Sequence, residues 1–320
     1  MNHFYIVRHR FKKSNIYWFI SFMTVTAFFY SFIHIENTKY VNYKHKLHEK
    51  ESVLCLILTS EASFIRRSVT VWNTWAHKCH KALFVCNCRN LTRKLYLNSS
   101  KSLFKNQVDY RVALRLPIWQ LEIKDESKNM GEKVFQILKG AYDNYTKEFK
   151  WFLLTDDDTF IFVDNLYKFI VNKSASEPLT YGYNINRYVP SGFQSGGAGI
   201  LFTNESLKRI TLNIRKGICN QSKGYGDVAL GRCQYMSNVT LGNSLDEKGR
   251  ERFHPFKFRD HYKNNLPEWL HNFSSNGVRT GDNCCSDETI SFHYNSVDEM
   301  HFFENLKNQE NINSLFKVTL

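Results

Sequence analysis

The hydrophobic and polar positions of this chain change period several times, and these changes predict alternating strands and helices. Residues 51–60 form a short, continuous apolar run, which is typical of a strand buried on both faces of a parallel sheet. Residues 64–80 carry apolar side chains at helical intervals, and residues 81–86 are again strand-like. A strand, a helix and a strand in this order predict the beginning of a βαβ unit.

The same alternation continues into the middle of the chain. Residues 128–145 are expected to form a helix, because their apolar side chains fall on one face. Residues 150–155 predict another buried strand. Farther on, Thr203 or Asn204 could act as the N-cap of a short helix. Because no linker rich in proline, glycine or serine divides residues 51–320, we expect a single α/β domain there.

The first fifty residues follow a different pattern. Residues 16–33 contain no formal charge, and as a helix they would span about 27 Å, close to a hydrocarbon core of about 30 Å. Basic residues precede this segment, so the positive-inside rule predicts a cytoplasmic N-terminus. A cleaved signal peptide and a buried core helix are the alternatives. The expected division is a cytoplasmic tail at 1–15, a transmembrane signal-anchor at 16–35, a stem at 36–50 and a lumenal domain at 51–320.

Composition agrees with a globular, lumenal domain. Apolar residues make up 42% of the chain, which is enough for a substantial core. The net charge of +13 would suit nucleic-acid binding, but no block of cations dominates the domain and a membrane anchor conflicts with that function. We therefore expect no nucleic-acid partner.

Cysteines and glycosylation sequons also favour the lumen. The eight cysteines are even in number and would pair in an oxidising compartment. Zinc is the alternative for His77, Cys79, Cys86 and Cys88, although these lack a paired C-x2-C spacing. Glycosylation of a sequon would place its asparagine on the surface. The sequons begin at Asn90, Asn98, Asn144, Asn172, Asn204, Asn220, Asn238 and Asn272.

Three acids, Asp156, Asp157 and Asp158, directly follow the strand predicted at residues 150–155. Open α/β sheets bind ligands at the carboxyl ends of their strands, so this position favours a binding site over a solvated turn or a helix N-cap. On an extended segment Asp156 and Asp158 point the same way. Such a D-x-D pair can hold Mg²⁺ or Mn²⁺ together with the oxygens of a diphosphate. In a lumenal protein it indicates a glycosyltransferase that uses a nucleotide sugar.

A transfer with inversion also needs a carboxylate that takes the proton from the acceptor hydroxyl. Asp227 is the candidate for this catalytic base, because it is the one acid in the small and apolar stretch GDVALG. A helix N-cap or a salt-bridge partner is the structural alternative for Asp227.

Five segments of the chain together resemble a known family. They are WFLLTDDDTFIFVDNL at 151–166, SGGAGILFTNESLKR at 195–209, GDVALGRC at 226–233, RFHPF at 252–256 and CCSDETISFHY at 284–294. In this order they are similar to the core 1 β1,3-galactosyltransferases, or T-synthases, within the fringe-like β1,3-glycosyltransferases. The resemblance implies a GT-A (Rossmann-like) fold in a type II Golgi membrane protein. It also implies UDP-galactose as donor, Mn²⁺ as metal, and GalNAc α-linked to Ser or Thr of a glycoprotein as acceptor.

The resemblance implies roles for individual residues. Asp156, Asp157 and Asp158 would bind the donor, Asp156 and Asp158 would hold the metal with His293, and Asp227 would be the general base. His254 is the other histidine that the residues alone would place beside His293 as a ligand. The disulfides implied by the resemblance are Cys55 with Cys79, Cys219 with Cys233 and Cys284 with Cys285. The pairing of Cys86 and Cys88 is left open.

Two departures from the family pattern concern the acceptor. Gly226 stands where the family has an acid, and the segment 267–283 keeps only Trp269 and Phe273 of a denser aromatic run. A related β1,3-glycosyltransferase with another donor or acceptor is therefore one alternative. A catalytically silent, chaperone-like homologue is a second, although that branch lacks the D-x-D acids. A homodimer is compatible with either.

Overall fold

The computed structural model describes Thr26 and residues 51–89, 91, 111–123, 129–219 and 225–306. Backbone contacts divide the chain into Met1–Glu49 and Lys50–Leu320, and all the elements named below belong to the second unit. The predicted tail, signal-anchor and stem, apart from Thr26, lie outside the described residues. Among the helices that the structure does describe, none combines the length and the apolar character needed to span a bilayer.

Strands and helices alternate along Lys50–Leu320. The strands are β1 Val53–Leu58, β2 Lys81–Cys86, β3 Ile118–Gln120, β4 Trp151–Asp156, β5 Phe160–Ile161, β6 Leu179–Tyr181, β7 Asn184–Ile185, β8 Phe193–Gln194, β9 Ile200–Thr203, β10 Thr240–Leu241, β11 Phe253–His254 and β12 Ser291–Phe292. The α-helices are α2 Val69–Thr74, α5 Met130–Tyr145, α6 Val163–Ile170, α7 Asn204–Arg215, α8 Gly226–Met236, α9 Phe258–Lys263, α10 Glu268–Phe273 and α11 Val297–Leu306. Shorter turns are the π-helical Phe64–Ser68 and the 3₁₀-helical Ala76–Lys78 and Gly281–Asn283.

The strands predicted at 51–60, 81–86 and 150–155 are confirmed as β1, β2 and β4, and the helix predicted at 128–145 is confirmed as α5. Thr203 caps α7, because its Oγ1 accepts a hydrogen bond from the backbone N–H of Ser206 at 3.0 Å.

The helix predicted within 64–80 is confirmed in part, because the segment is helical from Phe64 to Lys78 but is not one regular α-helix. The segment is a π-helical turn, the short helix α2 and a 3₁₀ turn in succession. Side-chain hydroxyls bond back to the main chain here, as when Thr70 Oγ1 donates to the carbonyl of Arg66 at 2.9 Å. π-Turns are frequent at functional sites, and this one carries Arg67.

The central sheet has seven strands in the order β10-β6-β9-β4-β1-β2-β3. Strands β3, β2, β1 and β4 run parallel, and β9 is antiparallel to its neighbours β4 and β6. Parallel strands need crossover connections, and α2 makes the one between β1 and β2. This mixed α/β architecture with a parallel-rich sheet fits a GT-A type domain.

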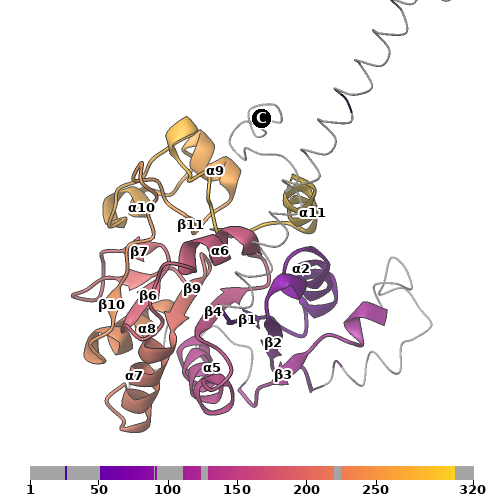
Figure 1. Ribbon diagram of the computed structural model, residues 1–320, viewed down its shortest axis with the longest axis vertical. Coiled ribbons are helices and arrows are strands. Elements are labelled where there is room, and N and C mark those ends of the chain that lie inside the picture. Colours follow the sequence, from indigo (N-terminus) through magenta and orange to yellow (C-terminus); the bar gives the residue numbers. More distant parts are fainter. Residues whose placement is uncertain are drawn as a thin grey trace, which may run out of the picture. The chain divides into compact units, whose positions relative to one another are not determined.

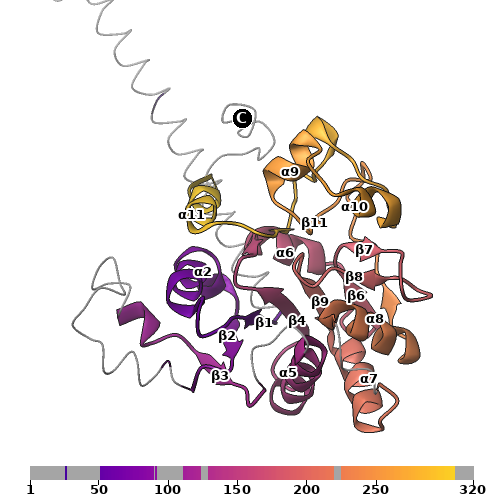
Figure 2. The ribbon, with the colours of Figure 1, turned by 180° about the vertical axis from the view of Figure 1, so that it is seen from behind.

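Both faces of the sheet are covered by helices, which explains the continuous apolar runs of its strands. Val53, Cys55 and Ile57 of β1 share a core cluster with residues of α2, α6 and α11. The alternate side chains Leu54 and Leu56 share a second cluster with residues of α5, α7 and α8. Figures 1 and 2 show α2, α6 and α11 on one face and α5 and α7 on the other. Each leucine or valine buried in this way contributes about 1.5–3 kcal/mol.

A second, three-stranded sheet brings the C-terminal part of the chain to the end of β4. Its order is β11-β12-β5, and β12 pairs antiparallel with β5, which begins two residues after Asp158. The register places Phe292 opposite Phe160 and Ser291 opposite Ile161. His293, the next residue after β12, therefore lies beside the acidic turn that follows β4.

Four disulfides are present in the structure. They join Cys55 to Cys79, Cys86 to Cys88, Cys219 to Cys233 and Cys284 to Cys285. The alternative of zinc at Cys79, Cys86 and Cys88 would need free thiolates, which these disulfides remove.

The sequon asparagines do not share one environment. Asn144, Asn172, Asn238 and Asn272 are exposed. Asn204 is an exception to the expectation that each would be accessible, because its Nδ2 donates to the carbonyls of Thr146 at 2.8 Å and Phe149 at 3.0 Å. Those bonds hold the amide that glycosylation would need. Asn90, Asn98 and Asn220 lie outside the described residues.

Candidate active site

The acidic turn at the end of β4 directs its three carboxylates to two places. Asp157 turns toward the β1 side, where its Oδ2 accepts hydrogen bonds from Thr59 Oγ1 and Ser63 Oγ, each at 2.6 Å. Arg67 lies 3.3 Å from Asp157 Oδ1 and 3.2 Å from Asp158 Oδ2. Asp157 does not belong to the residues that line the cavity described below. Its contacts instead hold Arg67 beside Asp158.

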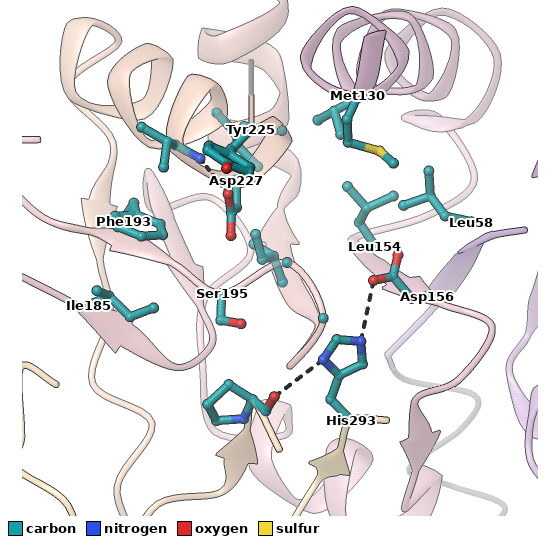
Figure 3. A pocket seen from close by; sticks show the side chains of 18 of the residues that line it. Leu58, Met130, Leu154, Asp156, Ile185, Phe193, Ser195, Tyr225, Asp227 and His293 are labelled. Atoms are coloured by element: carbon teal, nitrogen blue, oxygen red, sulfur yellow. Dashed lines mark hydrogen bonds and ion pairs between the residues drawn. The ribbon is translucent and has the colours of Figure 1, made fainter. Parts of the chain in front are cut away.

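Asp156, Asp158 and His293 come together as a candidate metal group. Their ligand atoms all lie within 4.8 Å of one another. His293 Nε2 is 3.1 Å from Asp158 Oδ1 and 3.6 Å from Asp156 Oδ2. The other ring nitrogen, Nδ1, faces the carbonyl of Pro255 at 3.3 Å, so Nε2 is the nitrogen presented to the acids (Figure 3). A backbone carbonyl in this place is the usual support of a metal-binding histidine.

The electrostatics of this group suit a cation. Burial and the neighbouring carboxylates of Asp158 and Asp157 raise the pKa of Asp156 to about 6, with His293 opposing the shift. Burial also acts to raise the pKa of Asp158, but His293 and Arg67 outweigh it and lower that pKa. Among the described residues, the buried Asp158 Oδ1 accepts no hydrogen bond of good geometry. Two crowded carboxylates and an imidazole that faces a buried oxygen of one of them form a donor set that fits a divalent cation.

Gly197 allows the imidazole of His293 to reach the acids. A Cβ at this glycine would lie 2.0 Å from His293 Cε1 and 2.2 Å from Nδ1, closer than any real Cβ contact. The same loop is anchored to the acidic turn, because Thr159 Oγ1 donates to the carbonyl of Gly197 at 2.8 Å. The loop therefore sets the position of the histidine ring.

We expect Gly197→Ala to weaken divalent-cation binding about 10- to 100-fold, the range seen when groups that orient a metal ligand are changed. The methyl group would push the ring of His293 away from Asp158. Calorimetric titration of Mn²⁺ in the presence of UDP measures the effect. Gly196→Ala is the matched control, since a Cβ there would meet only Asp227 Cβ at an ordinary 3.6 Å. Equal Mn²⁺ affinity in the two variants would contradict this role of Gly197.

Asp227 lies in the first turn of α8 rather than at its N-cap, which is Tyr225. Its Oδ1 accepts a hydrogen bond from the backbone N–H of Val228 at 2.8 Å. Burial raises the pKa of Asp227, while hydrogen bonds from the backbone of Val228 and Gly196 oppose the rise. The carboxylate points into a cavity (Figure 3) and its charge is close enough to raise the pKa of Asp156.

That cavity has a volume of about 770 Å³, within the usual range for a small-molecule site. Figure 3 shows Leu58, Leu154 and Asp156 on one side and Ile185 and Phe193 on the other, with Asp227 and Ser195 between them. Its mouth carries large aromatic side chains that stay partly exposed: Tyr188, Tyr225, Trp269 and Tyr294. The cavity thus joins a candidate metal group at one end to a carboxylate with a raised pKa near its middle.

His254 does not take part in this site. It is fully buried, its ring stacks on Phe292 with centroids 4.4 Å apart, and its Nδ1 faces the carbonyl of Ser291 at 2.8 Å. Burial lowers the pKa of His254 to about 4. It is a packed core residue behind His293.

Several residues of the site were not predicted. The glycine-rich SGGAG was a visible signal, although its purpose is clear only from the contact between Gly197 and His293. Nothing in the sequence marked Arg67 or Arg187 as a site residue. A single arginine in a helical or loop segment is ordinarily a charge exposed to solvent. Of the segment 267–283, Trp269 lines the cavity and Phe273 packs beneath Arg187.

Comparison with known proteins agrees with the resemblance. No family model matches the chain. Glycoprotein-N-acetylgalactosamine 3-beta-galactosyltransferase 1 of Xenopus laevis is 30% identical over 263 residues, which cover 81% of this chain and 67% of the relative. Human chondroitin sulfate synthase 3 is 31% identical over 128 residues, 37% of this chain and 14% of its own length. Mouse beta-1,3-glucosyltransferase is 25% identical over 175 residues, 53% of this chain and 34% of its own. The chain belongs to the family of the core 1 β1,3-galactosyltransferases, within the fringe-like β1,3-glycosyltransferases.

Proposed function

We propose that this protein is an inverting glycosyltransferase of core 1 O-glycan synthesis. It moves galactose from UDP-galactose, in β1,3 linkage, to GalNAc α-linked to Ser or Thr of glycoproteins. The observation that carries the proposal is that Asp156 and His293, two members of the candidate metal group with Asp158, line the same cavity as Asp227. The name of the Xenopus relative, a glycoprotein-N-acetylgalactosamine 3-beta-galactosyltransferase, supports galactose as the transferred sugar and GalNAc of glycoproteins as the acceptor.

Asp156, Asp158 and His293 form the donor end in this proposal, with Mn²⁺ as the cation. When bound, the cation would neutralise charge on the departing diphosphate. Asp157 serves the donor end indirectly, because it holds Arg67 within 3.2 Å of Asp158. Leu58 and Leu154 line the same side of the cavity as Asp156 and give that side an apolar wall (Figure 3).

Asp227 acts as the general base. It removes the proton of the acceptor hydroxyl as that oxygen attacks the sugar from the face opposite the leaving group, which inverts the anomeric configuration. Burial helps, since a carboxylate with a raised pKa accepts a proton more readily.

The proposed setting is the Golgi membrane, with residues 16–35 as a type II signal-anchor and residues 51–320 in the lumen. The apolar run at 16–33 and the basic residues before it support this topology. A homodimer is compatible with it.

The test is incubation of the purified protein with a panel of UDP-sugars and a GalNAc-bearing peptide, with the linkage of the product read by NMR. We expect galactose in β1,3 linkage and no product after EDTA treatment. Transfer of another sugar, or transfer only to another acceptor, would favour a related β1,3-glycosyltransferase. Gly226 and the reduced aromatic segment at 267–283 are the sequence features that support this alternative. If no donor and acceptor pair gave a product, the chaperone-like alternative would be favoured. The intact D-x-D acids are the sequence feature that argues against it.

A further inference from the structure

Arg187 lies in the loop between β7 and β8, where two aromatic rings hold its guanidinium group. The guanidinium carbon is 4.0 Å from the ring centroid of Phe273 and 4.5 Å from that of Tyr188. Tyr188 has a φ of 63°, a left-handed conformation that non-glycine residues adopt at a cost on the order of 1 kcal/mol or more. The loop therefore maintains an unfavourable backbone conformation at the residue whose ring contacts the arginine.

The N–H groups of Arg187 have no partner of their own within the described part of the chain. No ion pair and no side-chain hydrogen bond joins its guanidinium to those residues, whereas Arg250 and Arg252 each have an acidic partner. Stacking uses the faces of a guanidinium, and the five N–H donors lie at its edges. Arg187 is thus held in place with its donors available to a ligand.

The position of the loop connects Arg187 with the acceptor rather than the donor. Arg187 lines the same cavity as Asp227. Ile185 and Phe193, at the two ends of its loop, face Asp156 across the cavity, with Asp227 between (Figure 3). A donor held at Asp156 would occupy the far side. The partly exposed aromatic side chains of Tyr188 and Trp269 line the near side, which is open to solvent and to a large acceptor.

We propose that Arg187 binds a carboxylate of the acceptor, close to the sugar that receives the transferred residue, and so makes the enzyme prefer acidic acceptors. This inference rests on the proposed function and names the substrate class for the same site. A guanidinium fork matches a carboxylate with two parallel hydrogen bonds. Arg187 and His293 are the basic residues among those that line the cavity. No ion pair joins Arg187 to Asp156 or Asp227, the acids of that lining, so the acceptor would supply its counter-charge.

The experiment compares two GalNAc-peptides that differ only by Glu or Gln beside the glycosylated residue. The wild type should use the Glu peptide with about tenfold higher kcat/KM, in keeping with one charge-assisted bidentate pair. Arg187→Gln should bring the ratio of the two values to about one, and Arg187→Glu should reverse it in favour of the Gln peptide. The ratio cancels any loss of activity common to both peptides, and UDP binding reports that each variant is folded.

Arg259→Gln is the matched control, because Arg259 is exposed on α9 and does not line the cavity. It should keep the preference for the Glu peptide. A second pair of acceptors, with the carboxylate on an adjoining sugar instead of the peptide, separates the two sources of that group. Equal use of acidic and neutral acceptors by the wild type, or an unchanged preference in Arg187→Gln, would overturn the inference. Transfer to neither peptide but to another sugar would contradict the proposed acceptor, and the acidic-to-neutral ratio for that sugar then decides the role of Arg187.

Discussion

Asp158→Asn is expected to lower metal-dependent transfer by at least about 10³-fold while the domain stays folded. A metal ion supplies several kcal/mol of transition-state charge stabilisation, and each 1.4 kcal/mol corresponds to a factor of ten. The substitution replaces one carboxylate oxygen of Asp158 with an amide nitrogen that cannot ligate a metal, and it removes the negative charge that lies 3.1 Å from His293 Nε2. It also removes one of two crowded negative charges, which offsets the lost ion pair with Arg67. Activity across a titration of Mn²⁺ into EDTA-treated protein measures the effect.

Asp143→Asn is the control for Asp158→Asn. It removes a carboxylate of a surface pair with Arg215 and leaves the cavity untouched. An Asp158→Asn enzyme that kept the activity of the wild type and its dependence on Mn²⁺ would exclude Asp158 as a metal ligand. So would UDP binding by the wild type that is tight in EDTA and unchanged by added Mn²⁺.

Asp227→Asn is expected to keep UDP-galactose binding and to lose turnover by about 10²–10⁴-fold, the usual contribution of a general base. Donor binding and turnover respond differently because the Asp227 carboxylate acts on the acceptor hydroxyl and not on the diphosphate of the donor. Calorimetry of donor binding beside initial rates with acceptor measures both effects. Turnover close to that of the wild type would remove Asp227 from the mechanism.

The pH profile gives a second test of Asp227. A base works only when deprotonated, so kcat/KM should fall as the pH drops through its pKa. Burial raises that pKa above the ordinary value, and the acid limb should therefore lie at higher pH than for an exposed aspartate. A residual rate in Asp227→Asn should lack this limb. If the acid limb of the pH profile stayed at the same pH in Asp227→Asn, it would report the titration of another group.

Local hydrophobic patterns were sufficient to predict the strands that are buried on both faces and the helix that is buried on one face. Strands β1, β2 and β4 are apolar throughout because helices cover both faces of the sheet, and α5 buries a single face. The irregular turns within 64–80 had no such pattern, since Arg67 and the preceding Ser63 contact Asp157, which is distant in the chain. The reversed direction of β9 had no local signal either, because pairing with β4 and β6 is a long-range choice.

By itself, the sequence determined where the D-x-D acids lie, because a buried strand followed by three acids is a local pattern. It also supplied the five ordered segments from which the family could be identified. The residues alone left His254 and His293 as equal candidates and the family resemblance implied His293, but only the tertiary structure shows what brings that histidine to the acids. The pairing of β5 with β12 brings His293 to them and leaves His254 buried behind Phe292, and Gly197 makes room for the ring. The physical reason is that strand register and close packing are set by contacts between distant segments, which no single stretch of residues encodes.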